Sequence, residues 1–140
     1  MKYLPRLADK ELAERLKYMG AVLIEGPKWC GKTTTAEQQA QSVIKLQNPD
    51  MREAYMVTAN TKPTNLLKGA VPRLIDEWQD APKIWDAVRS VIDERGGEPG
   101  QFILTGSNSV NDNEIMHSGT GRISRMRMLP MSLYESGESN

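Results

Sequence analysis

The clearest chemical pattern in the sequence is a glycine-rich loop that begins at Gly26 and ends at Thr33, with the letters GPKWCGKT. It matches G-x-x-x-x-G-K-[ST], the pattern of loops whose backbone N–H groups converge on phosphate oxygens at a helix N-terminus. In such a loop Lys32 reaches the β- and γ-phosphates of a nucleotide, and the Thr33 hydroxyl is a ligand of Mg²⁺. The residues predicted to contact the nucleotide are Gly26, Pro27, Lys28, Trp29, Cys30, Gly31, Lys32, Thr33 and Thr34.

Two carboxylates follow a short apolar run farther along the chain, in the segment Leu74-Ile75-Asp76-Glu77. In an open α/β sheet, ligands bind beyond the carboxyl ends of the strands, so this pair is expected beside the glycine-rich loop. Asp76 is predicted to hold the Mg²⁺ together with Thr33, and Glu77 to orient or deprotonate an attacking water. Acidic pairs are also common in solvated turns, and the loop is what favours the catalytic interpretation.

Polar residues also end a predicted strand at 101–105, where QFILT is followed by Gly-Ser-Asn. A hydroxyl or an amide at this place is expected to touch the γ-phosphate or the attacking water. Ser107 is the first candidate, followed by Asn108 and then Thr105. The alternative interpretation is a polar turn without a role in catalysis.

Three arginines lie in the segment Gly121 to Arg127, whose letters are GRISRMR. An arginine here is predicted to stabilise charge on the transferring phosphoryl group, either in its own chain or on a neighbouring subunit. Arg122 is preferred to Arg125, because glycines flank it and indicate close approach to another group. In a strand, the alternation places Arg122, Ser124 and Met126 on one face and Ile123, Arg125 and Arg127 on the other. The alternative is that the arginines simply face water.

Length and composition limit the remaining choices. A chain of 140 residues is about one domain, and its 18 Lys and Arg balance its 18 Asp and Glu, which gives no support to nucleic-acid or membrane binding. The longest strictly apolar run, Ala21 to Ile24, is far too short to span a bilayer, and the N-terminus lacks the apolar stretch of a signal peptide. A single cysteine fits a reducing compartment, so a cytoplasmic location is expected. His117 and Cys30 form no recognisable metal cluster.

Helices and strands are predicted to alternate along the chain, which is typical of an α/β three-layer sandwich with a mostly parallel sheet of about five strands. Strands are predicted at 21–25, 54–58, 71–76, 101–105 and 123–129. Helices are predicted at 9–19, 32–47 and from Pro82 to just before Gly96, with a poorly patterned connection at 59–70.

Four segments together resemble a known family, the AAA-like bacterial and archaeal ATPases whose C-terminal half is a DUF4143 domain. They are GPKWCGKTTTA, LIDEWQDAPKIWDAVR, QFILTGS and HSGTGRISRMRMLPMSLYESGE, in this order along nearly the whole chain. The resemblance implies an additional-strand P-loop fold, with one strand inserted between those that carry the phosphate loop and the acidic pair. It also implies that Lys32 and Thr33 are the phosphate-loop pair, Asp76 the metal carboxylate, Glu77 the catalytic acid and Arg122 part of the family's Gly-Arg element.

The same resemblance implies that residues 1–140 are one ATPase domain, with a helical lead-in at 1–20, taken from a longer protein with a further C-terminal region. The segment 58–71 fits the family pattern poorly, which leaves the second strand open. The expected function is Mg²⁺-dependent ATP binding and hydrolysis that drives a conformational change, and homo-oligomerisation is plausible. The alternatives are a nucleotide-dependent switch or scaffold with little hydrolysis, and a small-molecule P-loop kinase.

Overall fold

A computed structural model of the chain describes residues 7–27, 31–107 and 122–128. In this part of the chain, five strands form one sheet: β1 (Ala21–Glu25), β2 (Ser42–Lys45), β3 (Arg73–Asp76), β4 (Phe102–Gly106) and β5 (Ile123–Arg127). They lie in the order β2-β3-β4-β1-β5, and every neighbouring pair is parallel. Because β4 separates β1 from β3, the expected additional-strand α/β fold is confirmed.

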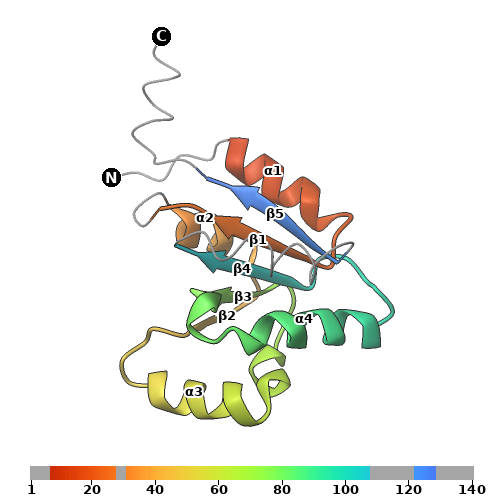
Figure 1. Cartoon of the computed structure of the whole chain (residues 1–140). Helices are drawn as coiled ribbons and strands as arrows, with labels where there is room; N and C mark the ends of the chain where they lie inside the picture. The colour runs from red at the N-terminus through yellow and green to blue at the C-terminus, as the bar shows by residue number, and fades with distance from the viewer. Residues whose placement is uncertain (1–6, 28–30, 108–121, 129–140) are drawn as a thin grey trace.

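Helices cover both faces of this sheet (Figure 1). One face carries α1 (Leu7–Leu16) and α2 (Lys32–Gln39), and the other carries α3 (Arg52–Thr61) and α4 (Lys83–Glu94). Two short 3-10 helices complete the elements: η1 (Pro63–Leu67) lies before β3 and η2 (Trp78–Asp80) lies after it. Parallel strands need long crossover connections, usually through a helix, and α2, α3 and α4 lie in the connections that lead to β2, β3 and β4.

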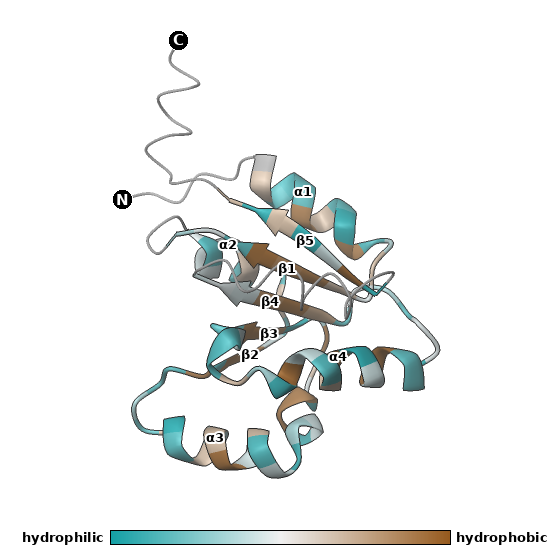
Figure 2. Cartoon of the chain, viewed as in Figure 1, coloured by the Kyte–Doolittle hydropathy of each residue, from teal (hydrophilic) through white to brown (hydrophobic). Residues whose placement is uncertain are grey.

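The central strands are buried on both faces and therefore read as continuous apolar runs rather than as alternating ones. Every residue of β1 and of β4 is buried, and Figure 2 shows the hydrophobic colour concentrated on these strands. On one face, Val22 and Ile24 pack with Leu12 of α1 and Ala36 of α2. The second core cluster lies on the opposite face, beneath α3, η1 and α4.

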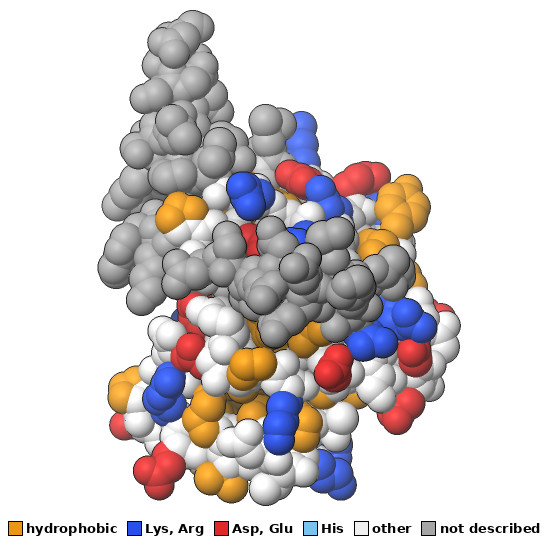
Figure 3. All heavy atoms as spheres, viewed as in Figure 1, with side chains coloured by type: hydrophobic (Ala, Val, Ile, Leu, Met, Phe, Trp, Pro, Cys, Tyr) orange, Lys and Arg blue, Asp and Glu red, His pale blue; other side chains and the backbone are white. Residues whose placement is uncertain are grey.

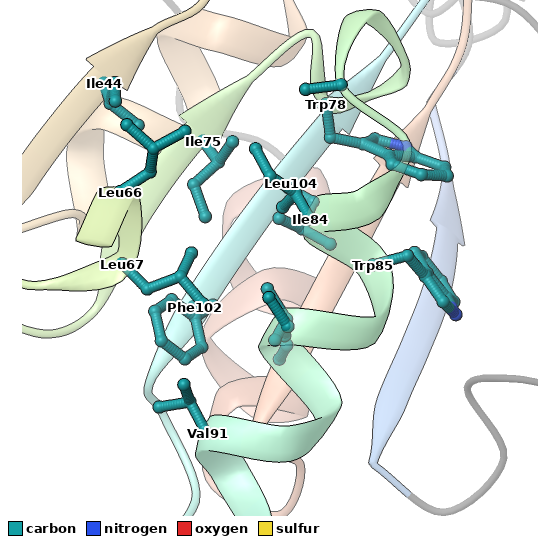
Figure 4. Close-up of a cluster of buried hydrophobic side chains, with 14 of the residues drawn as sticks. Ile44, Leu66, Leu67, Ile75, Trp78, Ile84, Trp85, Val91, Phe102 and Leu104 are labelled. Atoms are coloured by element: carbon teal, nitrogen blue, oxygen red, sulfur yellow. The ribbon is translucent and has the colours of Figure 1, made fainter. Parts of the chain in front are cut away.

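That second cluster joins the sheet to η1, η2 and α4 (Figure 4). Leu66, Leu67, Ile84 and Phe102 are among its buried members. Trp78 and Trp85 are buried with ring centroids 5.0 Å apart, so both side chains pack in this core. Ile84, Val88, Val91 and Ile92 of α4 belong to this cluster, and their i, i+4, i+7 and i+8 spacing is the pattern of one apolar helix face.

The predicted helix at 32–47 is wrong in its second half. Helix α2 ends at Gln39, because Ala40 adopts an extended conformation (φ −79°, ψ 141°), and Ser42 to Lys45 form the edge strand β2 beside β3. The β-branched residues Val43 and Ile44 favour the extended backbone there.

The predicted strand at 54–58 is also wrong, since these residues belong to α3. Ala59 is buried, and Tyr55 and Met56 pack against the same core, at the i, i+1 and i+4 spacing of one helix face. Val57 is apolar but mostly exposed, which gave the segment the false look of a continuous apolar strand. The connection expected at 59–70 contains the end of α3 and all of η1.

The remaining elements agree with their predictions within a few residues: β1, β3, β4, β5 and α4, together with α1, which ends somewhat earlier than expected at Leu16. The predicted alternation in β5 is confirmed, because Ile123 packs in the cluster under α4 and Met126 in the cluster under α1. None of the helices in the described part of the chain is both long and apolar enough to cross a bilayer.

Candidate nucleotide site

The carboxyl ends of β1, β3 and β4 meet at one edge of the sheet, as parallel strands require. A cavity of about 500 Å³ opens at this edge, within the size range of small-molecule sites. Its lining brings together most of the described residues that the sequence singled out, with one addition, Gln47: they are Gly31, Lys32, Thr33, Thr34, Gln47, Asp76, Glu77 and Ser107.

The described part of the glycine-rich loop leads directly from β1 into α2. Gly31 is the residue before α2 and has φ of 91°, a left-handed conformation that glycine adopts without strain. This places Lys32 and Thr33 in the first turn, where helix N–H groups favour an anion. Lys32 is buried, and its Nζ donates to the Pro27 carbonyl oxygen over 3.1 Å. Of the predicted contact residues, 28–30 lie outside the described part of the chain.

The Thr33 hydroxyl and Asp76 lie next to one another, as predicted. Thr33 Oγ1 donates to Asp76 Oδ1 over 2.7 Å, and Thr105 Oγ1 donates to the same oxygen over 2.7 Å. Among the described residues there is no cluster of three or more His, Cys, Asp or Glu that would form an all-protein cage. One hydroxyl and one carboxylate fit Mg²⁺, because this ion keeps several waters and takes few protein oxygens beside phosphate oxygens.

Glu77 follows β3 in an unusual backbone conformation, with φ of 60° and ψ of 54°. A left-handed glutamate is uncommon and is strained unless its surroundings hold it. Here the Glu77 N–H donates to Thr105 Oγ1 over 3.0 Å. The Ser107 hydroxyl lies 2.9 and 2.7 Å from the two carboxylate oxygens, and Gln79 Nε2 donates to Oε1 over 2.6 Å. The turn is therefore pinned at both its backbone and its side chain.

The comparison with known proteins agrees with this geometry. A family described as AAA domain matches residues 19–137, which is most of the chain. The chain belongs to this AAA domain family. None of the curated proteins matches it in sequence.

Solved structures resemble this AAA domain in fold. AMPPCP-bound DnaA from Aquifex aeolicus matches with a TM-score of 0.51 and 18% identity over 90% of the chain. A DNA replication initiation factor matches with a TM-score of 0.49 and 18% identity over 86% of the chain, and C. elegans PCH-2 with 0.42 and 13% over 87%. The chain spans 47%, 44% and 40% of the lengths of these three structures. The first match supports the fold of an AAA-type P-loop ATPase.

Arg122 is not brought to the cavity of its own AAA domain. It lies just before β5, and its carbonyl oxygen accepts from the N–H of Ala21 at the start of β1, so it sits at the opposite edge of the sheet. Its Nε donates to Asp93 Oδ1 of α4 over 2.5 Å, and this hydrogen bond raises the pKa of the Arg122 guanidinium. Of the two alternatives for Arg122, action within its own chain does not fit this placement.

The other candidate residues differ in how they meet the cavity. Ser107 lines the cavity. Thr105 is fully buried, and its hydroxyl donates a hydrogen bond to Asp76 and accepts one from the Glu77 N–H. Asn108 lies outside the described residues. Arg125 forms a bidentate ion pair with Glu25, the last residue of β1. The distances from Nε to Oε1 and from Nη2 to Oε2 are both 3.0 Å.

Two glutamines at the site were missed by the sequence analysis. Gln47 lines the cavity and donates to Asp80 Oδ2 over 2.9 Å, and Gln79 holds Glu77. Gln47 follows β2, the strand that the sequence analysis placed within a helix, so its position could not be foreseen. Gln79 lies two residues after Glu77, and the only signal for it was this proximity to the acidic pair.

Proposed function

We propose that this chain is a Mg²⁺-dependent ATPase domain that binds ATP and hydrolyses its β–γ phosphoanhydride. The observation that carries the proposal is the convergence of Lys32, Thr33, Asp76 and Glu77 on one cavity, with Ser107 bound to the Glu77 carboxylate. A phosphate-binding lysine, an oxygen pair suited to Mg²⁺ and a buried carboxylate are the parts that phosphoryl transfer to water needs.

Each residue has a separate role in this proposal. The Lys32 ammonium leaves the Pro27 carbonyl oxygen and binds the β- and γ-phosphates. Thr33 and Asp76 hold Mg²⁺, which neutralises charge on the phosphate oxygens when it is bound. Glu77 accepts a proton from the attacking water as the water oxygen bonds to the γ-phosphorus, and the bond to the bridging oxygen breaks to release ADP. Ser107 keeps the carboxylate aimed at that water.

Arg122 is proposed to act on the site of a neighbouring copy of the chain. Its place at the far edge of the sheet, with its side chain partly exposed beside Asp93, supports action between subunits over action within one. The proposal therefore includes a homo-oligomer in which ATP binds where one copy meets the next. It also includes a longer protein with a C-terminal region that the ATPase cycle moves, and a cytoplasmic location supported by the single cysteine.

Nucleic acid is not part of the proposal. On the face shown in Figure 3, Lys and Arg side chains lie among Asp and Glu side chains and form no single positive field. The proposed partners are ATP, ADP, Mg²⁺ and further copies of the chain. The kinase alternative rests on residues 117–122, of which 117–121 lie outside the described part.

The experiment that tests the proposal measures nucleotide binding by calorimetry and phosphate release on the same samples, with and without Mg²⁺. We expect the wild type to bind ATP and to release phosphate, Lys32→Ala to lose binding, and Glu77→Gln to keep binding but lose about 10²- to 10³-fold in turnover. Binding without phosphate release in the wild type would indicate the switch or scaffold instead. No binding in the wild type would overturn the proposed site.

A further inference from the structure

Gln79 makes the shortest of the hydrogen bonds that the structure gives to the Glu77 carboxylate. Its Nε2 lies 2.6 Å from Glu77 Oε1. We propose that Gln79 is a positioning residue, which sets the direction of the Glu77 carboxylate for the attack of water. This inference rests on the proposed ATPase function and adds a residue that the chemistry of the phosphate loop and the acidic pair does not require.

Two donors from different elements hold this carboxylate. Ser107 comes from the end of β4 and reaches both carboxylate oxygens, whereas Gln79 comes from η2 and reaches only Oε1. One hydroxyl alone leaves the plane of the carboxylate free to turn, and a second donor from another direction removes that freedom. A carboxylate has about four acceptor sites, so the oxygens can still accept a hydrogen bond from water.

The amide of Gln79 has one acceptable orientation while Glu77 is ionised. With Nε2 toward Glu77 the pair attracts, and a flipped amide would set an oxygen against the carboxylate. The other end, Oε1, is buried and accepts no hydrogen bond from any residue that the structure describes. Leaving a buried acceptor unpaired carries a free-energy cost, so the turn holds Gln79 here for its donor rather than for its acceptor.

The space beside Gln79 exists because residue 106 is a glycine. A Cβ at Gly106 would lie 3.2 Å from Gln79 Oε1 and 3.2 Å from Trp78 Nε1, closer than most such contacts. The end of β4 thus makes room for the glutamine side chain one residue before it supplies Ser107. Replacing Gly106 is a way to push Gln79 without removing its amide.

Gln47, the glutamine that lines the cavity, has a different hydrogen-bond partner. Gln47 donates to Asp80 and not to Glu77. Lining the cavity is therefore not enough to place an amide on the catalytic carboxylate, and the contact of Gln79 depends on the left-handed turn at Glu77. This difference between two glutamines of one site supports a specific role for Gln79.

The test uses Gln79→Met, which keeps the length of the side chain and removes the donor. We expect ATP affinity within about twofold of wild type and kcat lower by about tenfold to a hundredfold, since small misplacements of a reacting group have effects of this size. Gln79→Glu should lower kcat further, because it sets a second carboxylate against Glu77. Gly106→Ala should give a smaller loss of kcat. Gln41→Met is the matched control, at an exposed position after α2, and should leave kcat unchanged.

A second arm separates positioning from a merely structural role. In a Glu77→Gln background, Gln79→Met should cause no further loss of turnover, because the group through which Gln79 acts is already absent. In ¹⁵N-labelled wild type, the side-chain amide signal that disappears in Gln79→Met should move when Glu77 is replaced by Gln. This signal reports the contact whether or not the sample hydrolyses ATP.

The outcomes are distinct. The inference is overturned if kcat of Gln79→Met stays within twofold of wild type, if the loss is equally large without Glu77, or if the amide signal does not respond to Glu77→Gln. If the wild type binds ATP but releases no phosphate, the proposed ATPase function fails, and this result says nothing about the contact between Gln79 and Glu77. An amide signal that does not respond to Glu77→Gln would then overturn the role of Gln79 as well.

Discussion

The carboxyl edge of the sheet, formed by the carboxyl ends of the strands, and the amino edge, formed by their amino ends, differ in how their polar groups are buried and paired. At the carboxyl edge, Lys32, Glu77 and Ser107 are all less than a tenth exposed and hydrogen-bond to protein atoms at the cavity. At the amino edge, Arg122 and Asp93 form an ion pair whose side chains are 38% and 52% exposed. Burying polar groups has a large free-energy cost unless each is paired, so a fold gathers them at one edge only where they serve a purpose.

The contrast shows that burial and mutual hydrogen bonding distinguish the candidate site from the amino edge, and that charge alone does not. Two arginines close together in the chain show both situations: Arg122, just before β5, forms an exposed pair with Asp93, and Arg125, within β5, forms a part-buried pair with Glu25. The comparison can be tested by removing side chains at each edge and measuring the free energy of unfolding.

The largest effect is expected for Arg125→Leu. The Glu25 carboxylate beneath it is 9% exposed, and removal of the guanidinium leaves this charge buried without its two-pronged partner. We expect the free energy of unfolding to fall by about 3 kcal/mol, because the buried Glu25 carboxylate would lose the guanidinium that compensates its charge. Urea unfolding followed by circular dichroism measures it. Arg127→Leu, on the same strand face but exposed, is the control, and an equal loss in both variants would contradict the argument.

A smaller loss is expected for Thr105→Val, which keeps the shape of the side chain. The variant removes the acceptor of the Glu77 N–H and a donor to Asp76, and it leaves a buried N–H unpaired. We expect a loss of about 2 kcal/mol in the free energy of unfolding, together with weaker Mg²⁺-dependent ATP binding. Thr105→Ser retains the hydroxyl and should recover most of both. Equal behaviour of the two variants would contradict the role given to the Thr105 hydroxyl.

Asp80 is intermediate between the buried polar residues at the cavity and the exposed pair of Arg122 and Asp93, because its side chain is only partly buried. It accepts hydrogen bonds from Gln47 at the cavity and from Arg52 at the start of α3, both 2.9 Å long. Asp80→Ala is expected to lower the free energy of unfolding by about 1 kcal/mol. Asp86→Ala, which breaks an exposed pair with Arg89 on α4, is the matched control and should change little. A loss for Asp86→Ala as large as that for Asp80→Ala would contradict the expectation that the partly buried aspartate contributes more to stability than the exposed one.

Much of the candidate site at the carboxyl edge could be predicted from the sequence, because its signals are local. The glycine pattern from Gly26 to Thr33, the acidic pair after an apolar run and the polar end of a strand are each contiguous in the chain. Parallel pairing then brings them together without further information. This is why Lys32, Thr33, Asp76 and Ser107 lie where their patterns placed them.

What could not be predicted depends on contacts between distant segments. The edge strand β2 has four residues and gains its conformation from pairing with β3, so local helix propensity misassigned it. The apolar residues of α3 are consistent with a strand from their sequence alone, and only their contacts with the core show that they share one face of a helix. The hydrogen bond from Gln79 to Glu77 forms across a left-handed backbone at Glu77, which no local pattern indicates for a glutamate.

The smallest effect is expected at the amino edge, for Arg122→Leu. Its hydrogen bond to Asp93 is short, at 2.5 Å, but both side chains are exposed, and water replaces such partners readily. The bond raises the pKa of Arg122, so its stabilising contribution is complete below the ordinary guanidinium range and is lost only as pH rises through the higher folded value. Titration of Arg122 therefore adds no pH dependence near neutrality. Thermal unfolding of Arg122→Leu and Asp93→Asn should stay within about 2 °C of wild type. A larger drop would mean that the amino edge relies on this ion pair, and the contrast between the edges would fail.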